Sequence, residues 1–198
     1  DRIFVTGSPM PEVLAEHLGP IQASQVLKRL GLEERGYFLL SAHREENIDR
    51  EETFLSLLEA LWALAERYGK PILYACPPRA RKQLEQMPNA LHPLVQRHPP
   101  LGVHDYNRLQ LSAFRVLSDS GTLPEESSFF RVHGFPFPAV CLRPVTERPE
   151  AVEQGAFLLA GTQREQILSA VETALAMANQ GDLGSPVPAY ADENVSCK

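Results

Sequence analysis

Apolar residues along the chain follow two different patterns. Mostly apolar runs of strand length lie at 37–42, 72–76, 114–118, 139–142 and 156–160. Helical spacing, with apolar residues three or four positions apart, is found at 9–18, 22–30, 50–68, 79–87, 106–113, 127–132 and 163–178. Because the two kinds of segment alternate, they predict parallel β–α–β units and hence a doubly wound α/β domain with a Rossmann-like parallel sheet.

The segments outside these patterns divide the chain. Residues 2–8 are predicted to form an edge strand or a connector, residues 88–100 a Pro-rich connection, and residues 181–198 a tail without clear periodicity. We therefore expect a connector with the first helix at 1–18, a Rossmann-like domain at 19–180 and a truncated tail segment at 181–198. The 198 residues suffice for one domain with a substantial core.

Residues 114–128, FRVLSDSGTLPEESS, predict a buried strand, a Ser-Gly turn and a helix entered through Pro124. The first N–H groups of such a helix lack intrahelical partners, and the peptide dipoles favour negative charge there, so the turn is a candidate phosphate site. Glu125 and Glu126 lie in the first helical turn. Their carboxylates either complement the dipole, or one of them accepts a hydrogen bond from a sugar hydroxyl.

Two more polar segments come directly after predicted strands. They are residues 43–47, HREEN, and residues 146–151, TERPEA. Ligands of doubly wound sheets bind beyond the carboxyl ends of the strands. We therefore expect His43, Ser120 and the loop 143–148 to lie at one edge of the sheet.

The segment HREEN also has a structural interpretation, in which Asn47 and Asp49 cap the following helix. Capping leaves the His and the Arg at the strand tip unexplained. A His side chain has a pKa near working pH, so His43 suits catalysis as well as binding. Arg44 is expected either to pair with Glu46 or to reach an anionic ligand.

In TERPEA, Pro149 predicts the start of a helix. A structural role would pair Arg148 with Glu147 or Glu126 across the loop. A functional role would place its planar guanidinium on a phosphate or sugar oxygen. These residues alone leave both roles open.

In order and rough spacing, HREEN, SDSGTLPEESS and TERPEA resemble the C-terminal half of the non-hydrolysing UDP-N-acetylglucosamine 2-epimerase family, over nearly the whole chain. VTGSPMPEVL and DYNRLQ are similar to the branch that forms UDP-N-acetyl-L-fucosamine for capsule and O-antigen polysaccharides. The resemblance implies one half of a two-domain GT-B-type architecture. It also implies a homodimeric parent isomerase that inverts C2 of a UDP-2-acetamido sugar by eliminating UDP and adding it back.

The same resemblance assigns roles to single residues. His43 is the implied catalytic residue, Ser120 and Gly121 would bind the phosphates, Glu126 the ribose hydroxyls, and Tyr106 the uracil. The implied contacts of the UDP-sugar are Arg44, Ser120, Gly121, Glu126, Arg148 and Tyr106. Most acid–base carboxylates would belong to an N-terminal domain outside this chain, so the chain alone is expected to be inactive.

The chain departs from the family pattern at two positions. Thr122 stands where a second Gly is common, and its Cβ narrows the backbone approach to a diphosphate. Pro77 replaces a common His, so any role of that His is absent here.

Two other functions remain open. One is the C-terminal domain of a UDP-sugar glycosyltransferase with the same architecture, against which HREEN and TERPEA argue. The other is a nucleotide-binding or regulatory module without chemistry of its own.

Charge and composition exclude several classes of binding partner. The formal net charge of −6 provides no basic footprint for nucleic acid or an anionic membrane. No apolar run in the sequence approaches the length of a membrane-spanning helix. Cys76 and Cys141 lie in apolar runs without CxxC spacing, so we expect inert buried thiols and a reducing, cytoplasmic setting. No residues have metal-ligand spacing, and neither a metal nor a cofactor is expected.

Overall fold

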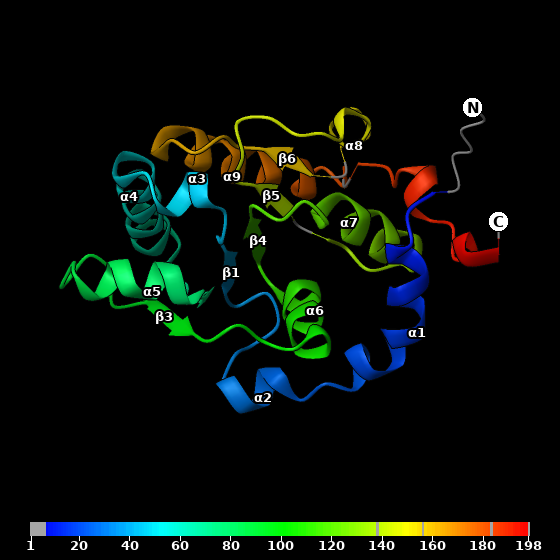
Figure 1. The fold of residues 1–198 in the computed structure, drawn as a ribbon, viewed down its shortest axis with the longest axis horizontal. Helices are drawn as coiled ribbons and strands as arrows, with labels where there is room; N and C mark the ends of the chain where they lie inside the picture. Colours follow the sequence, from blue (N-terminus) through cyan, green and yellow to red (C-terminus); the bar gives the residue numbers. More distant parts are fainter. Residues whose placement is uncertain (1–6, 138, 156, 183, 198) are drawn as a thin grey trace.

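Parallel strands form one sheet in the computed structural model, which describes residues 7–137, 139–155, 157–182 and 184–197. The strands are β1 (Phe38–Ser41), β2 (Ile72–Ala75), β3 (Val95–His98), β4 (Arg115–Ser118), β5 (Ala139–Cys141) and β6 (Leu158–Leu159). Their order is β3-β2-β1-β4-β5-β6 (Figure 1), and the described neighbours all pair in parallel. This confirms the predicted doubly wound fold. The strand order reverses between β1 and β4, where such folds bind ligands.

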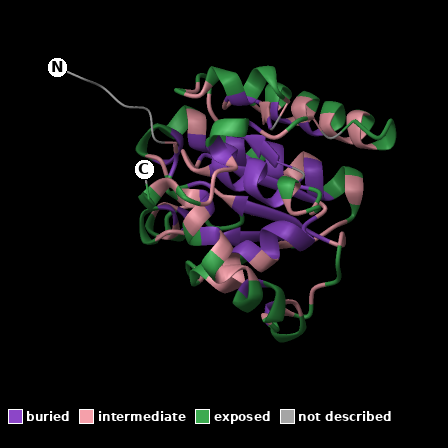
Figure 2. Ribbon diagram, turned by 90° about the vertical axis from the view of Figure 1, so that its right-hand side faces the viewer, coloured by how far each residue is buried: buried purple, intermediate pink, exposed green. Residues whose placement is uncertain are grey.

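The central strands are apolar because both of their faces are covered. Successive side chains of a strand point to opposite faces of the sheet. Phe38 and Leu40 of β1 therefore pack into one core with Tyr74 of β2, whereas Leu39 packs into a second core with Leu73. Figure 2 shows these buried strands in the middle of the molecule, with the exposed residues on the outer helices and loops.

Helices cover both faces of the sheet and close the two cores. The first core is covered by α4 (Glu51–Tyr68), α5 (Pro78–Glu85) and α9 (Arg164–Asn179). The second is covered by α1 (Met10–Ala23), α2 (Val26–Leu30), α6 (Val103–Ser112), α7 (Leu123–Val132) and α8 (Pro149–Glu153). The short elements are α3 (Glu45–Ile48) and the 3-10 helices η1 (Pro188–Tyr190) and η2 (Val195–Cys197). None of the described helices is long and apolar enough to cross a membrane.

Two of the sequence-based element predictions are wrong. Strand β3 lies within the stretch predicted to be an irregular connection, because an edge strand needs no apolar run; its Gln96 and Arg97 are exposed. Helix α1 continues through Pro20, where a break was predicted, and the buried Ile21 next to it packs into the second core. Residues 2–6 of the predicted N-terminal edge strand lie outside the described residues.

The tail packs onto the domain, although its sequence has no periodicity. Val187 and Tyr190 join the second core at 4% and 7% exposure. The Val187 N–H donates a hydrogen bond to Ser128 Oγ of α7 at 3.1 Å. A single turn of 3-10 helix is too short to produce a repeating apolar pattern.

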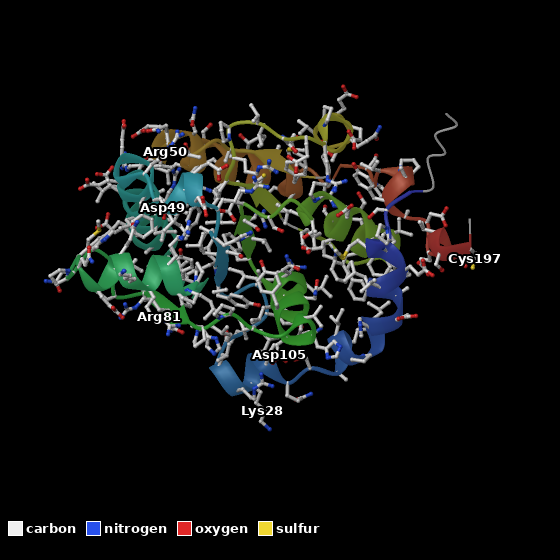
Figure 3. The ribbon with its side chains drawn as sticks, in the orientation of Figure 1. Lys28, Asp49, Arg50, Arg81, Asp105 and Cys197 are labelled. Carbon is white, nitrogen blue, oxygen red and sulfur yellow. The ribbon has the colours of Figure 1, made fainter. Side chains whose placement is uncertain are left out.

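The expected capping of the helix after HREEN is also wrong. Asn47 lies inside the short helix α3, and α4 begins after Arg50 without a side-chain cap. Figure 3 labels Asp49 and Arg50 at the junction of α3 and α4. The Asp49 carboxylate instead pairs with Arg79 at 2.7 Å. Asn47 is 4% exposed, and its side chain is used elsewhere, in the site described next.

Candidate functional site

The buried carboxylate of Asp119, directly after β4, ties together the loops at the carboxyl edge of the sheet. It accepts hydrogen bonds from the N–H groups of His43 at 3.0 and 3.1 Å and of Arg44 at 2.9 Å. Asn47 Nδ2 donates to the same carboxylate at 2.9 Å and to the Leu142 carbonyl at 3.0 Å. Three strand ends, those of β1, β4 and β5, are thereby held in one geometry.

The imidazole of His43 is oriented by the same carboxylate. Its Nδ1 lies 2.8 Å from Asp119 Oδ1, and the hydrogen bond raises the pKa of His43. Burial alone would raise the pKa of Asp119, but the bonds from His43, Arg44 and Asn47 hold it below its ordinary value. The His43 side chain is 49% exposed whereas that of Asp119 is 0% exposed. The ring therefore has one nitrogen fixed by a buried charge, which leaves Nε2 for a ligand.

The Ser-Gly turn lies between β4 and α7, as predicted. The Ser120 N–H donates to Ser118 Oγ at 3.1 Å, and Ser120 Oγ lies 2.9 Å from Thr122 Oγ1. No side chain caps α7. Within the part of the chain that the structure describes, the N–H groups of Gly121 and Leu123 have no hydrogen-bond partner. Open N–H groups at a helix N-terminus attract an anion.

Two charged side chains approach the turn closely at Gly121. A Cβ at Gly121 would lie 3.3 Å from Glu147 Oε1 and 3.6 Å from Arg44 Nη2. Arg44 and Glu147 therefore lie directly over the turn. Arg44 Nε donates to the Asp119 carbonyl at 2.9 Å, and among the described residues it forms no ion pair with Glu46, so that suggested pairing is not present.

Glu126 lies in the first turn of α7, and its side chain faces α6. Its carboxylate accepts hydrogen bonds from Gln110 Nε2 and Thr122 Oγ1, both at 2.8 Å, and burial raises its pKa. The Thr122 hydroxyl thus points to the Glu126 carboxylate, four residues further along the chain. Tyr106 of α6 packs against the second core, with its hydroxyl near Ser41 and Ser118 at the ends of β1 and β4.

Arg148 pairs with neither of its predicted structural partners. Its Nη2 lies 3.0 Å from Glu125 Oε1, and its guanidinium stacks 5.2 Å from the centre of the Tyr190 ring. Ser8 Oγ donates to the same Glu125 oxygen at 2.7 Å. Arg148 therefore joins the N-terminal segment, α7 and the tail. Its Nε is buried without a hydrogen-bond partner in the described part of the chain.

Sequence reasoning missed two charged residues of this site. Asp119 is the only acidic residue in the run 114–120, and its place at the end of a buried strand was a signal for a structural or catalytic carboxylate. Arg143 follows β5 and holds Glu147 in a bidentate pair at 3.1 and 2.5 Å, which lowers the pKa of Glu147 to about 2. No sequence pattern distinguished Arg143 from an ordinary surface arginine.

The site residues fall into two groups. His43, Arg44, Ser120 and Gly121 are brought together around Asp119, and beside them a shallow cavity of 560 Å³ is lined by residues 43–46, 49 and 50. The second group consists of Tyr106 in α6, Glu126 in α7 and Arg148 at the start of α8. No cluster of three or more His, Cys, Asp or Glu residues suited to a metal ion occurs among the described residues.

Comparison with known proteins decides the family. The family model described as UDP-N-acetylglucosamine 2-epimerase matches residues 1–198. The chain belongs to the UDP-N-acetylglucosamine 2-epimerase family. The UDP-N-acetylglucosamine 2-epimerase of Methanocaldococcus jannaschii is 31% identical over 183 residues, which cover 88% of this chain and 48% of that relative. The chain thus spans about half the length of the curated relatives it matches.

Solved structures of the family share the fold. The UDP-N-acetylglucosamine 2-epimerase from Rickettsia bellii matches 96% of this chain and 49% of its own, with a TM-score of 0.81 and 34% identity. The Methanocaldococcus jannaschii enzyme, solved in complex with UDP-GlcNAc and UDP, matches 87% of this chain and 48% of its own, with a TM-score of 0.75 and 30% identity. The resemblance inferred from HREEN, SDSGTLPEESS and TERPEA is therefore confirmed at the level of the family.

Proposed function

We propose that this chain is the UDP-binding half of an isomerase that inverts C2 of a UDP-linked 2-acetamido sugar. The reaction would remove the C2 proton and eliminate UDP from C1 to leave a glycal, and would then add UDP back to C1 with a proton delivered to the opposite face of C2. Membership of the epimerase family supports this assignment. The observation that carries it is the arrangement around Asp119, which sets His43 and Arg44 beside an open helix N-terminus at the strand-order reversal.

The proposed binding of the diphosphate follows from the donors at this edge. The N–H groups of Gly121 and Leu123 have no partner among the described residues and lie at the positive end of α7. Arg44 Nη2 lies over Gly121. His43 adds a further donor, because its Nδ1 bond to Asp119 favours the protonated imidazole. These donors would stabilise the charge that UDP gains as it leaves the sugar.

The Arg143–Glu147 pair must change when a diphosphate binds. Glu147 Oε1 occupies the space over Gly121, and a carboxylate there repels phosphate oxygens. Its side chain is 53% exposed and thus free to turn outward. Once Glu147 has moved, the Arg143 guanidinium has two N–H donors for the phosphates.

The nucleoside end is proposed to lie on the other side of the turn. Glu126 accepts one hydrogen bond on each oxygen, which leaves lone pairs for the ribose hydroxyls. Tyr106 is proposed to contact the uracil, and the Arg148 Nε donor a phosphate or sugar oxygen. The parent is proposed to be a homodimer in the cytoplasm, and the free thiols of Cys76 and Cys141 fit such a reducing compartment.

Calorimetry tests the nucleotide site. UDP should bind the 198-residue chain more tightly than UMP, because UMP lacks the second phosphate. Asn89→Asp, which adds a negative charge beside a different cavity in the loop after α5, serves as a control and should leave UDP affinity unchanged. Absence of UDP binding by the correctly folded chain would refute the assignment.

Deuterium exchange tests whether catalysis needs the proposed N-terminal domain in addition to this chain. In heavy water the chain alone should not exchange the C2 proton of any UDP-2-acetamido sugar, because inversion needs acid–base groups on both faces of the ring. A longer protein that contains the chain and the proposed N-terminal domain should exchange it. Transfer or hydrolysis of the sugar without C2 exchange would favour a glycosyltransferase instead. Exchange by this chain alone, lost in His43→Ala, would show that the complete machinery lies here.

A further inference from the structure

A second cavity lies at the opposite edge of the sheet, at the amino ends of β4, β5 and β6. It has a volume of 390 Å³, which is large enough for a small organic molecule. Its walls come from the strand starts at Phe114, Ala139 and Leu158 and from the C-terminal half of α9. The UDP site proposed above uses the carboxyl ends of the strands, so this cavity is separate from it.

Three arginines line the cavity, although the chain as a whole is acidic. Arg35 donates to the carbonyl of Ala113, Arg115 to those of Phe114 and Ala174, and Arg131 to those of Gly155 and Phe137. These bonds span 2.5 to 3.3 Å. Among the described residues none of the three forms an ion pair with a carboxylate. Asp182 lines the cavity and Glu34 lies near Arg35, but neither is within ion-pair distance of these guanidinium groups.

Part of this donor capacity is buried and unused. Arg115 is 7% exposed, and its Nε has no hydrogen-bond partner in the part of the chain that the structure describes. Nε of Arg131 is buried and unpartnered in the same way. Burial lowers the pKa of all three arginines, to about 10 for Arg131, and the nearby carboxylates of Glu34 and Asp182 only partly oppose this effect for Arg35 and Arg131. An anion in the cavity would supply the opposite charge.

The remaining wall limits which anion fits. Phe137, Phe157, Leu158 and Leu175 present apolar surface to the same space. Inorganic phosphate would leave this surface against water, whereas a carboxylate on a ring or short apolar chain would cover it. Nucleoside diphosphates carry too much polar surface for such walls.

We propose that this cavity binds a small organic anion, with a carboxylate held by Arg35, Arg115 and Arg131 and an apolar or ring body against the phenylalanines. This site is independent of the UDP site.

Benzoate is the probe for the test, with benzamide and inorganic phosphate as comparisons. A ligand of this size is expected to bind with a Kd on the order of 1 mM by calorimetry or NMR shift. Benzamide lacks the charge and phosphate lacks the ring, so each should bind at least about tenfold more weakly. Failure of benzoate to bind, or equal binding of benzamide, would overturn the proposal.

Two kinds of variant locate the binding. Arg115→Gln and Arg35→Gln should each weaken benzoate binding by about tenfold, whereas Arg97→Gln, an exposed arginine of β3 far from the cavity, should not. Ala178→Leu leaves all three arginines in place and narrows the cavity from the α9 side, so it tests the location even if Arg115→Gln does not fold. Unchanged benzoate affinity in both folded Ala178→Leu and folded Arg35→Gln would show that benzoate binds elsewhere and would overturn the proposal.

Discussion

Asp119→Asn tests whether one buried carboxylate organises the whole edge of the sheet. The change keeps the shape of the side chain and removes its charge. Oδ2 accepts the N–H groups of His43 and Arg44 and the Asn47 amide, at 3.0, 2.9 and 2.9 Å. A hydrogen bond to a charged acceptor contributes about 1 kcal/mol more than one to a neutral acceptor. If Asn keeps its oxygen at this place, the three bonds together lose about 3 kcal/mol.

The substitution also reverses the bond to the imidazole. An Asn amide facing His43 Nδ1 donates where the carboxylate accepted, so the ring must become the tautomer with its proton on Nε2. The pKa of His43, which Asp119 raises, should then fall. Urea unfolding at pH 7 measures the free energy of unfolding, and NMR titration of the His43 ring measures the pKa.

The pH dependence of stability gives a second measure. The pKa of Asp119 is depressed, so its contribution is complete above the unfolded value of about 3.9 and is lost as pH falls through the folded pKa. The pKa of His43 is raised, so its contribution is complete below the unfolded value of about 6.5 and is lost as pH rises through the folded pKa. The pair therefore stabilises the fold most between about pH 4 and 6.5. In Asp119→Asn the free energy of unfolding should change less with pH, both below and above this range.

Asp49→Asn is the matched control, since it makes the same chemical change at an aspartate that forms an exposed ion pair with Arg79. An exposed pair contributes about 0–1 kcal/mol. The reasoning fails if Asp119→Asn costs no more than this control, or if the pKa of His43 is the same in both variants.

Three further predictions concern the proposed UDP site. The 2′-deoxy form of UDP should lose about 1–3 kcal/mol of binding energy relative to UDP, because Glu126 would face a missing hydroxyl; equal affinities by calorimetry would remove Glu126 from the ribose. Arg148→Ala should lower the free energy of unfolding by about 1–3 kcal/mol, because it leaves buried Glu125 without its cation. Urea unfolding of this variant, of Glu125→Gln and of the double variant should show that the two side chains are coupled. Gly121→Ala should weaken UDP binding by crowding the turn, whereas Gly102→Ala, with nothing within 4 Å of its added Cβ, should not; equal UDP affinities would contradict the close approach.

The fold and the place of the site were largely determined by local sequence. Buried parallel strands such as 37–42 and 114–118 are apolar on both faces, and their alternation with amphipathic helices leaves few possible topologies. Polar residues at strand ends, such as His43 and Ser120, then had to meet at the carboxyl edge. Edge strand β3 escaped prediction because its residues face water and need no apolar pattern.

The pairing of side chains was decided only by the tertiary structure. His43 and Asp119 are 76 residues apart, and Arg148 meets Glu125 rather than the adjacent Glu147. Which charges pair depends on the relative placement of strand ends and loops, and each local sequence offers several partners of the right sign. The sequence shows that Asp119 carries a charge. Its role became clear only from the structure, in which N–H groups of His43, Arg44 and the Asn47 side chain donate to a carboxylate that is buried away from water.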